Sequence, residues 1–294
     1  MTLITGVLTD EYVALMSDRR VTTRVGTRIV SQEDTDVKAI ALGGQFLMGF
    51  TGLARIADLR VEAWASSVLR DVKPEDYFEV LGRRIEEVFV REGQAGKIPH
   101  AFLAVGYASL RAGDPVNPLS ITISNSFDSR GRFSTAVPVS PHFSLSFERL
   151  ENRRQLVVPA GYPIHDTARR ALAHRIRVVV KGSPGNPALT VGPLLMALRD
   201  TSRRSGGSVG TAALFASMPR CALPDYSIAA GEVDYRRQVA SVFLPDEAQN
   251  AGDGVTYMPA LINQQMHVFG MKVHPRLLSP EEIRARAADK GYRY

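Results

Sequence analysis

The sequence predicts an α+β fold, a four-layer αββα sandwich in which two β-sheets pack face to face and a pair of helices covers the outer face of each. The main observation is the order of the periodic segments: strands, two helices, strands, two helices, strands. Length and composition agree, because 294 residues with 45% hydrophobic and 22% charged side chains can bury a large core. We expect residues 1–235 to form this core and residues 236–294 to form a C-terminal extension packed on it.

Two hairpins open the predicted fold. Residues 2–8 and 12–21 are rich in β-branched side chains on either side of a loop at 9–11. The stretches VKAIAL and QFLMGFT flank Gly43 and Gly44, a pair suited to a tight turn.

The pairing within these hairpins predicts where polar side chains meet. The first loop sets Thr2 opposite Asp18, and a turn centred on the glycine pair sets Lys38 opposite Gly49. Directly opposed residues of an antiparallel pair have Cβ atoms about 5 Å apart on one face. We therefore expect the threonine to meet an acid and the lysine to have room to cross the sheet.

Helical periodicity follows the hairpins. Apolar residues recur at helical spacing over residues 53–71, which predicts an amphipathic helix that opens directly after Gly52. A second helix is expected from Pro74, because proline and the acids Glu75 and Asp76 suit a helix start. Its expected core side chains are Tyr77, Leu81, Ile85, Val88 and Phe89.

The second half of the chain repeats this order. Strand patterns recur at 101–110, 119–126, 143–150 and 154–161. Helical patterns follow at 164–180 and 192–204. Two more strands are expected at 208–218 and 226–232, and a polar helix in the tail.

Charge and composition exclude several classes of protein. The net charge is +6 and the pI about 9.6, but basic residues are spread along the chain as on solvated faces, which argues against nucleic-acid binding. No apolar run approaches the ~20 residues that span a bilayer, and the first residues lack a signal-peptide pattern, so we expect a cytoplasmic protein without membrane contact. A single cysteine, Cys221, and scattered histidines give no metal-ligand spacing, so we expect neither metal nor cofactor.

Lysine usage is unusual at the N-terminal end. Only six of the 36 basic residues are lysines, and residues 1–72 contain seven arginines but the single lysine Lys38. A compact ammonium does chemistry that a broad guanidinium cannot, which indicates a specific role for Lys38.

In kind and spacing these residues resemble the proteasome β subunits and the related bacterial ATP-dependent ring peptidase, which are N-terminal nucleophile hydrolases. The matching residues are Thr2 after the initiator methionine, Asp18 in SDRR with Arg20 two residues on, Lys38 in DVKAI, and Gly52 in GFTG. The glycine-rich SGGS after a late helix follows in the family's order, so the resemblance covers about residues 2–235. It implies a threonine nucleophile, a peptide or other amide substrate and self-assembly into an oligomeric ring, and it leaves open whether an ATPase is a partner.

Two positions depart from the family pattern. Where the family has a serine in a Gly-Ser-Gly turn, this chain has Ala160, Gly161 and Tyr162, so a supporting hydroxyl is absent. The family's late acid stands three residues before the serine of Ser-Gly-Gly, whereas Asp200 and Ser205 are five residues apart. We keep Asp200 and Ser205 as candidate site residues on this partial match.

The residues themselves account for the expected chemistry. Thr2 at a free N-terminus offers a hydroxyl nucleophile and an α-amine, whose pKa of about 7.7–8.0 leaves part of it neutral near neutral pH. A Lys38 ammonium would lower the pKa of that amine, because a like charge at about 4 Å costs ~4 kcal/mol at an effective dielectric constant of ~20. Asp18 would hold the lysine charged, and the N–H of Gly52 at a helix start would receive the oxyanion. The predicted reaction is acyl transfer to Thr2 followed by hydrolysis.

Other interpretations stay open at this point. A catalytically silent ring or scaffold subunit of the same fold would keep Asp18 and Lys38 as a buried ion pair. GGSVG fits the G-x-S-x-G pattern around Ser208, but that motif needs a strand before the serine and a helix after it, and the predicted order is the reverse. Phe50 and Ala54 are the expected pocket walls, and they do not separate a peptide from a small amide.

Overall fold

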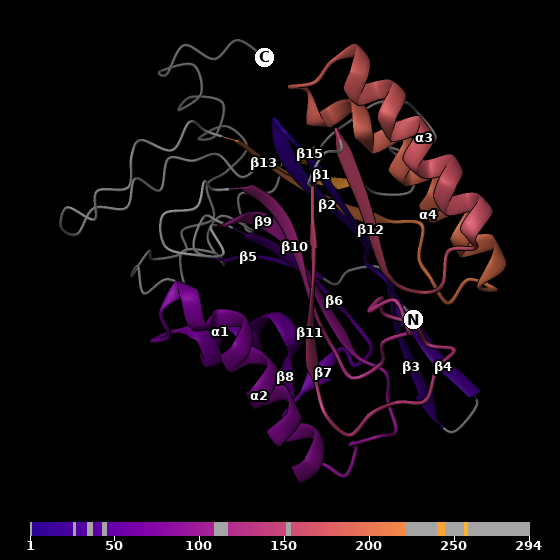
Figure 1. Ribbon diagram of the computed structural model, residues 1–294. Helices are drawn as coiled ribbons and strands as arrows, with labels where there is room; N and C mark the ends of the chain where they lie inside the picture. The colour runs from indigo at the N-terminus through magenta and orange to yellow at the C-terminus, as the bar shows by residue number, and fades with distance from the viewer. Residues whose placement is uncertain are drawn as a thin grey trace, which may run out of the picture.

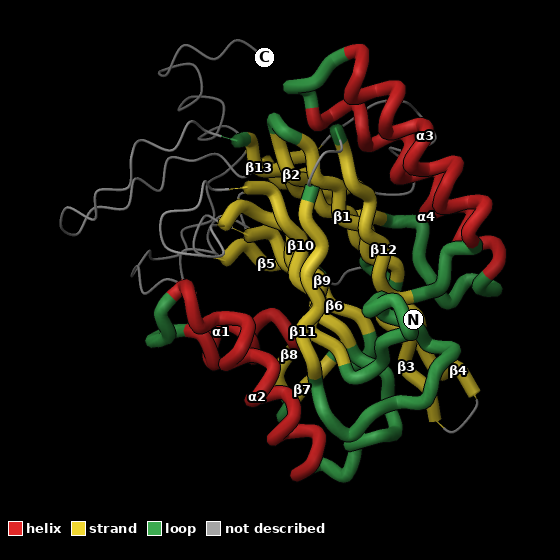
Figure 2. The backbone as a smooth tube through the Cα atoms, in the orientation of Figure 1, coloured by secondary structure: helices red, strands yellow, loops and turns green. Residues whose placement is uncertain are grey.

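The computed structural model describes residues 2–25, 28–33, 38–42, 46–108, 117–150, 154–220, 240–244 and 256–257. Over these residues the chain forms two large antiparallel sheets, two short ribbons and four α-helices (Figures 1 and 2). One helix pair lies on one side of the sheets and the other pair on the opposite side (Figure 1). The fold is therefore mixed α and β, as the sequence predicts.

The first sheet consists of β1 (Leu3–Thr9), β2 (Tyr12–Asp18), β12 (Gln155–Gly161), β13 (Ala213–Pro219), β14 (Ala240–Leu244) and β15 (Thr256–Tyr257). Their order is β12-β1-β2-β13-β14-β15. β1 and β2 are buried along their whole length, which explains their nearly continuous apolar sequences.

The second sheet consists of β5 (Ala39–Leu42), β6 (Phe46–Thr51), β9 (Ala101–Ala108), β10 (Asn117–Ser124) and β11 (Ser144–Arg149). Their order is β11-β10-β9-β6-β5. Two ribbons that the strand patterns of the sequence do not predict are β3 (Val21–Val25) with β4 (Arg28–Glu33) and β7 (Arg55–Ile56) with β8 (Leu59–Arg60).

The helices are α1 (Val61–Leu69), α2 (Tyr77–Arg91), α3 (Asp166–Gly182) and α4 (Val191–Arg204). Short 3-10 turns at Pro74–Asp76 and Pro187–Thr190 precede α2 and α4. The five side chains expected to face the core from α2 are all buried there.

Three apolar clusters hold these elements together. The first packs α1 and α2 against the five-stranded sheet and contains Trp64, Phe89 and Phe102. The second lies between the two sheets and contains Ile4 and Leu103. The third packs α3 and α4 against the six-stranded sheet.

The register of the first hairpin differs by one residue from the prediction. Ile4 pairs with Ser17, because the connection is a two-residue turn and Thr9 belongs to β1. The Thr9 hydroxyl closes that turn by donating to the carbonyl of Tyr12 at 2.7 Å and accepting the N–H of Tyr12 at 2.9 Å. The expected pairing of Thr2 with Asp18 is therefore wrong, and Asp18 lies across from Leu3.

The second hairpin is also shifted by one residue. Gly49 pairs with Ala39 instead of Lys38, and the turn residues 43–45 lie outside the described residues. Gly49 is needed for a different reason than expected, because a Cβ there would lie 2.9 Å from Ile4 of the facing sheet. Gly49 therefore allows the two sheets to pack closely at Ile4, and it does not make room for the Lys38 side chain.

The predicted helix over 53–71 begins eight residues late. Residues 55–60 form the β7–β8 ribbon instead, with Ala57 and Asp58 in left-handed conformations at its turn (φ 48° and 64°). Such a turn cannot be part of an α-helix, so the tertiary fold overrides the apolar periodicity. The predicted strand over 226–232 lies outside the described residues, as does most of the tail, although β14 extends the first sheet by pairing with β13.

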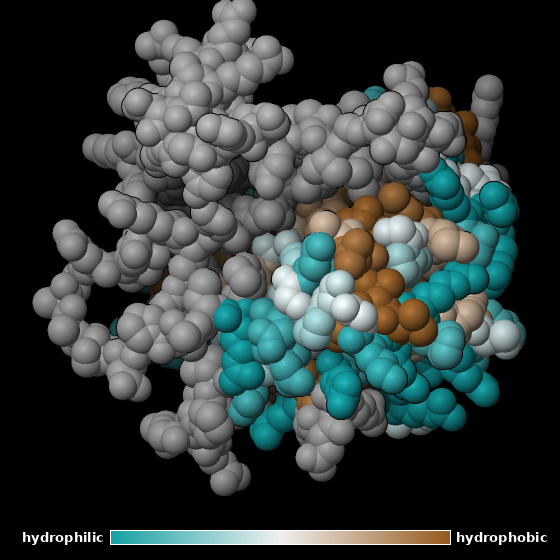
Figure 3. Space-filling view, turned by 90° about the horizontal axis from the view of Figure 1, so that it is seen from above, coloured by the Kyte–Doolittle hydropathy of each residue, from teal (hydrophilic) through white to brown (hydrophobic). Residues whose placement is uncertain are grey.

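The described surface is mixed in polarity. Figure 3, seen from above, shows apolar patches among hydrophilic residues. The largest exposed apolar side chains include Val90 at 62%, Val30 at 60% and Phe147 at 51%. Within the described ranges, none of the helices is long and apolar enough to cross a membrane.

Candidate active site

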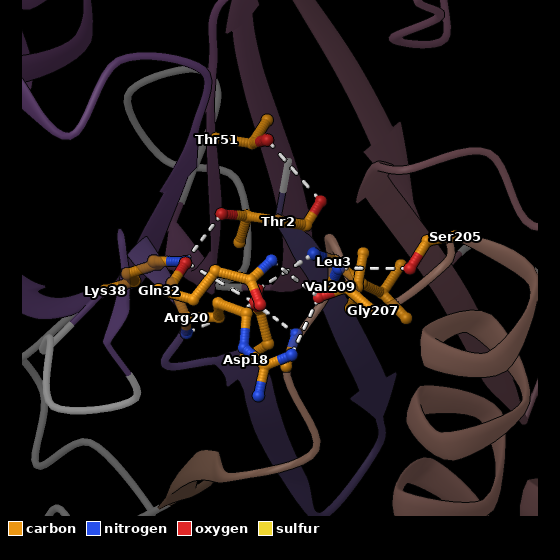
Figure 4. A network of polar contacts seen from close by, with 11 residues as sticks. Thr2, Leu3, Asp18, Arg20, Gln32, Lys38, Thr51, Ser205, Gly207 and Val209 are labelled. Atoms are coloured by element: carbon orange, nitrogen blue, oxygen red, sulfur yellow. Dashed lines mark hydrogen bonds and ion pairs between the residues drawn. The ribbon is translucent and has the colours of Figure 1, made fainter. Parts of the chain in front are cut away.

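Polar side chains converge at one end of the two sheets, where β1 begins and β2 and β6 end. Figure 4 shows Thr2 in the middle of this network, with Lys38 and Asp18 on one side and Thr51 on the other. Thr2 is 5% exposed and Lys38 is 2% exposed, so both side chains lie inside the protein.

Lys38 connects the second sheet to Thr2. Its Nζ donates to Thr2 Oγ1 at 2.7 Å and to the carbonyl oxygen of Arg20, and it lies 3.5 Å from Asp18 Oδ2. Lys38 immediately precedes β5, so a sheet edge fixes the base of its side chain. An ammonium in this place forms a charge-assisted hydrogen bond to the hydroxyl.

Asp18 is completely buried and surrounded by donors. Its Oδ1 accepts the N–H of Leu3 at 3.0 Å, and its Oδ2 accepts those of Gly210 at 3.0 Å and Arg20 at 3.3 Å. Burial raises the pKa of Asp18 above its usual value, while the Lys38 charge and the N–H groups oppose that rise. Because every neighbour donates, the ionised carboxylate is the form that this geometry matches.

Arg20 ties the glycine-rich loop to the site. Its guanidinium Nη1 donates to the carbonyl of Gly207 at 2.7 Å, and Gln32 Nε2 donates to the same oxygen at 3.3 Å. Gly207 has a φ of 77°, which favours glycine. The SGGS loop thus contributes to the site through its backbone, by bonding Arg20 and by leading to the Gly210 N–H that reaches Asp18.

The backbone of Thr2 is fixed from the opposite side. Its carbonyl accepts the N–H of Tyr162 at 2.7 Å and lies 3.5 Å from the hydroxyl of Thr51. Gly161 has a φ of 100°, and a Cβ there would overlap the Thr2 carbonyl. The PAGYP stretch, which lacks the family's serine, therefore places a backbone donor and a glycine beside Thr2.

Gly52 is exposed and has a φ of 111°. It follows Thr51, whose side chain contacts Thr2, so its backbone lies next to the site. The expected helix dipole at Gly52 is wrong, because the β7–β8 ribbon and not a helix follows. Any oxyanion stabilisation at Gly52 must come from its N–H alone.

The expected pocket walls lie in different surroundings. Phe50 is 1% exposed and its side chain belongs to the cluster under α1 and α2. Because side chains alternate along a strand, Phe50 points away from the face where Thr51 meets Thr2. Ala54 is half-buried, and its carbonyl accepts the N–H of Val61 at 3.4 Å.

The late acid and serine are not brought together. Asp200 forms a surface ion pair with Arg203 at 3.5 Å and lines a groove of about 280 Å³ between α3 and α4. Ser205 donates to the carbonyl of Ser202 at 2.9 Å and accepts the N–H of Val209 at 3.0 Å, so it caps the end of α4. Ser208 follows a helix and precedes β13, the reverse of the order that a serine nucleophile elbow needs.

Four features around this site do not follow from the sequence motifs: the Thr51 hydroxyl, the N–H of Tyr162, the positive φ of Gly161, and His100 beneath Gly52. Of these features, only the positive φ is indicated by the sequence, because the residue before Tyr162 is a glycine, Gly161. Over the part of the chain that the structure describes, no group of three His, Cys, Asp or Glu side chains could hold a metal ion.

No protein-family model and no curated relative matches this chain. Among solved structures it is similar to a Gly-1 mutant of Anbu from Hyphomicrobium sp. strain MC1, with 10% identity, a TM-score of 0.45, and 100% of this chain and 99% of that chain covered. It is also similar to Anbu, described as an ancestral beta-subunit, from Yersinia bercovieri, with 15% identity, a TM-score of 0.41, and coverage of 74% and 82%. Because these values are low, the function below rests on the site geometry.

Proposed function

We propose that this protein is an N-terminal threonine hydrolase of the four-layer αββα class, which cleaves peptide or other amide bonds after removal of Met1. The supporting observation is the 2.7 Å hydrogen bond from the buried Lys38 ammonium to the Thr2 hydroxyl, with Asp18 3.5 Å behind the lysine. A hydroxyl and an α-amine on the same residue, next to a fixed positive charge, form a complete nucleophile and base.

The reaction follows from these groups. The Thr2 hydroxyl oxygen attacks the substrate carbonyl carbon while its proton passes to the free α-amine. Collapse of the tetrahedral intermediate breaks the carbon–nitrogen bond, and the α-ammonium returns the proton to the leaving amine. Water then attacks the Thr2 ester by the same proton route, which releases the acid and restores the hydroxyl.

Lys38 stays protonated throughout and stabilises negative charge on the Thr2 oxygen. A unit charge about 4 Å away contributes ~4 kcal/mol at an effective dielectric constant of ~20, against ~1 kcal/mol in water. Burial of both side chains therefore matters as much as their distance. Asp18 and the Arg20 carbonyl hold the ammonium where it acts.

Turnover of a fluorogenic peptide-amide panel tests this proposal. The protein is produced without an N-terminal tag, and intact mass verifies that Met1 is removed. We expect Thr2→Ala to abolish turnover, Thr2→Ser to retain it, and Thr167→Ala, an exposed control on α3, to leave it unchanged. Turnover by protein that retains Met1 would contradict the mechanism.

The alternative is a catalytically silent subunit of the same fold. Two observations favour it: the position of the family's serine has no hydroxyl at Gly161, and Gly52 does not open a helix. In that case Asp18 and Lys38 form a structural ion pair. Processed protein that hydrolyses none of the panel would support this alternative.

Assembly, location and the tail are further proposals. We propose a self-assembled ring on the basis of the family resemblance, a cytoplasmic location on the basis of the sequence pattern, and packing of residues 236–294 on the core. A monomer by light scattering at micromolar concentration would contradict the ring without affecting the proposed chemistry.

A further inference from the structure

His100 lies directly beneath Gly52 and has no part in the mechanism above. Its ring is completely buried, and its Nδ1 accepts the N–H of Leu53 at 3.2 Å. A neutral imidazole accepts with one nitrogen and carries its proton on the other, so this contact assigns the proton to Nε2. Nε2 itself is buried and has no hydrogen-bond partner among the residues that the structure describes.

Aromatic rings surround the imidazole. The centroid distances are 4.9 Å to Phe102, 5.7 Å to Phe89 and 6.4 Å to Phe143, each with an edge-on arrangement. Burial among these groups lowers the pKa of His100 from 6.5 to about 3. The ring is therefore neutral at physiological pH.

The backbone of His100 is equally fixed. Its N–H donates to Asn125 Oδ1 at 2.9 Å, and its carbonyl accepts the hydroxyl of Ser124 at 2.8 Å. The amide of Asn125 donates in turn to the carbonyl of Ile98 at 2.9 Å. The imidazole thus stands on a rigid base at the start of β9.

The turn above the imidazole has little room. A Cβ at Gly52 would lie 2.6 Å from His100 Nδ1 and 2.7 Å from the Pro99 carbonyl. The positive φ of Gly52 and the bonded N–H of Leu53 together fix the orientation of both peptide groups in this turn.

We propose that His100 is a positioning residue, which holds the Gly52–Leu53 turn so that the Gly52 N–H points at the oxyanion of the reaction. This inference rests on the proposed function. A neutral acceptor suits the task, because a carboxylate there would oppose the developing negative charge.

Three variants separate positioning from packing. His100→Leu removes the acceptor at similar size, His100→Asn keeps a neutral acceptor close to the Nδ1 position, and Phe89→Leu disturbs the same aromatic cluster without contacting Leu53. Two quantities are measured: hydrogen exchange of the segment 51–54 by mass spectrometry, and the rate and concentration dependence of Thr2 labelling by a peptide epoxyketone.

We expect His100→Leu to raise exchange in this segment about 10-fold and to lower the maximal labelling rate about 10- to 100-fold, with half-saturation unchanged, as for a small misplacement of a catalytic group. His100→Asn should restore both quantities to within about 3-fold, because it restores the acceptor. Phe89→Leu should lower stability and leave both unchanged. Equal behaviour of His100→Leu and Phe89→Leu would overturn the proposal.

The two proposals fail in different ways. If processed wild-type protein is not labelled at all, the proposed hydrolase is wrong, and exchange alone then decides the role of His100: increased exchange in His100→Leu alone supports it, and unchanged exchange overturns it. If His100→Leu does not fold, ¹⁵N-histidine NMR of the wild-type protein decides instead. A neutral ring protonated on Nε2 at neutral pH is expected, and an Nδ1–H tautomer or an imidazolium would overturn the proposal.

Discussion

The two sides of Thr2 differ in charge. On one side, Lys38 and Asp18 place a buried ion pair against the hydroxyl, with backbone donors around the carboxylate. On the other side, His100 supports the Gly52–Leu53 turn as a neutral ring among aromatic rings. The first region places charged groups beside the Thr2 hydroxyl, and the second holds a backbone turn with an uncharged ring.

This difference indicates that the two regions have separate tasks in the proposed reaction. A nucleophilic oxygen needs a nearby positive charge as it loses its proton, whereas an oxyanion needs fixed N–H groups in a site without competing negative charge. The charged region should therefore be sensitive to changes of charge, and the neutral region to changes of shape.

Removal of the lysine should have the largest effect. We expect Lys38→Ala to reduce turnover about 10⁴-fold or more, the scale of losing one member of a catalytic unit. Lys38→Arg should also fail, because a broad guanidinium does not fit a buried ammonium site. Steady-state kinetics measure the loss, with the exposed Lys97→Ala as the control. If Lys38→Ala retained activity within tenfold of wild type, the ion pair of Lys38 and Asp18 would have no part in the mechanism.

The neutral His100 ring should affect how the free energy of unfolding depends on pH. The pKa of His100 is about 3 in the folded protein and near 6.5 when unfolded, so the unfolded chain binds the extra proton first. Stability from this group is present above about pH 6.5 and is lost as the pH falls toward 3, by up to ~5 kcal/mol. Urea unfolding at several pH values, compared with His100→Asn, isolates this contribution. An equal pH dependence in both proteins would show that His100 is not held neutral.

Gly161, which lies against the Thr2 carbonyl, should tolerate no side chain. We expect Gly161→Ala to destabilise the protein by about 2–4 kcal/mol, because its Cβ would overlap the Thr2 carbonyl at a φ of 100°. Gly192→Ala, where a Cβ meets nothing within 4 Å, is the matched control. Denaturant unfolding measures both, and equal stability of the two variants would mean that Thr2 is not confined by Gly161.

Neutralising the acid should have the smallest effect of the four. Asp18→Asn keeps the shape but turns an NH₂ group toward donors, so we expect turnover to fall about 10- to 100-fold, less than for Lys38→Ala. Asp71→Asn, at an exposed position, serves as the control. A loss larger than that of Lys38→Ala would mean that the acid does more than hold the lysine.

The charged side could be predicted from the sequence, even though both hairpin registers were off by one residue. The long Lys38 side chain reaches both the Thr2 hydroxyl and Asp18, and Asp18 accepts the N–H of Leu3 next to Thr2, so an error of one residue did not separate them. The identity of the only lysine near the N-terminal end and the spacing to the acid carried enough information.

The neutral side could not be predicted, because it depends on contacts between distant segments. His100 stands 47 residues from its partner Leu53, and nothing in its own neighbourhood distinguishes it from a core histidine. The helix expected after Gly52 failed for a similar reason. Its apolar positions Ile56, Val61 and Trp64 are buried in the structure, but a ribbon precedes the helix and supplies the first of them.

The adduct that a peptide epoxyketone forms tests the proposed function most directly, because closing its ring requires a hydroxyl and an amine on the same residue. We expect mass spectrometry of processed protein to find the reagent attached through both groups of Thr2 in the N-terminal peptide, and Ser208→Ala to leave the labelling unchanged. If fully processed protein forms no adduct with reagents that carry small and aromatic side chains, or forms it at Ser208, Thr2 is not the nucleophile.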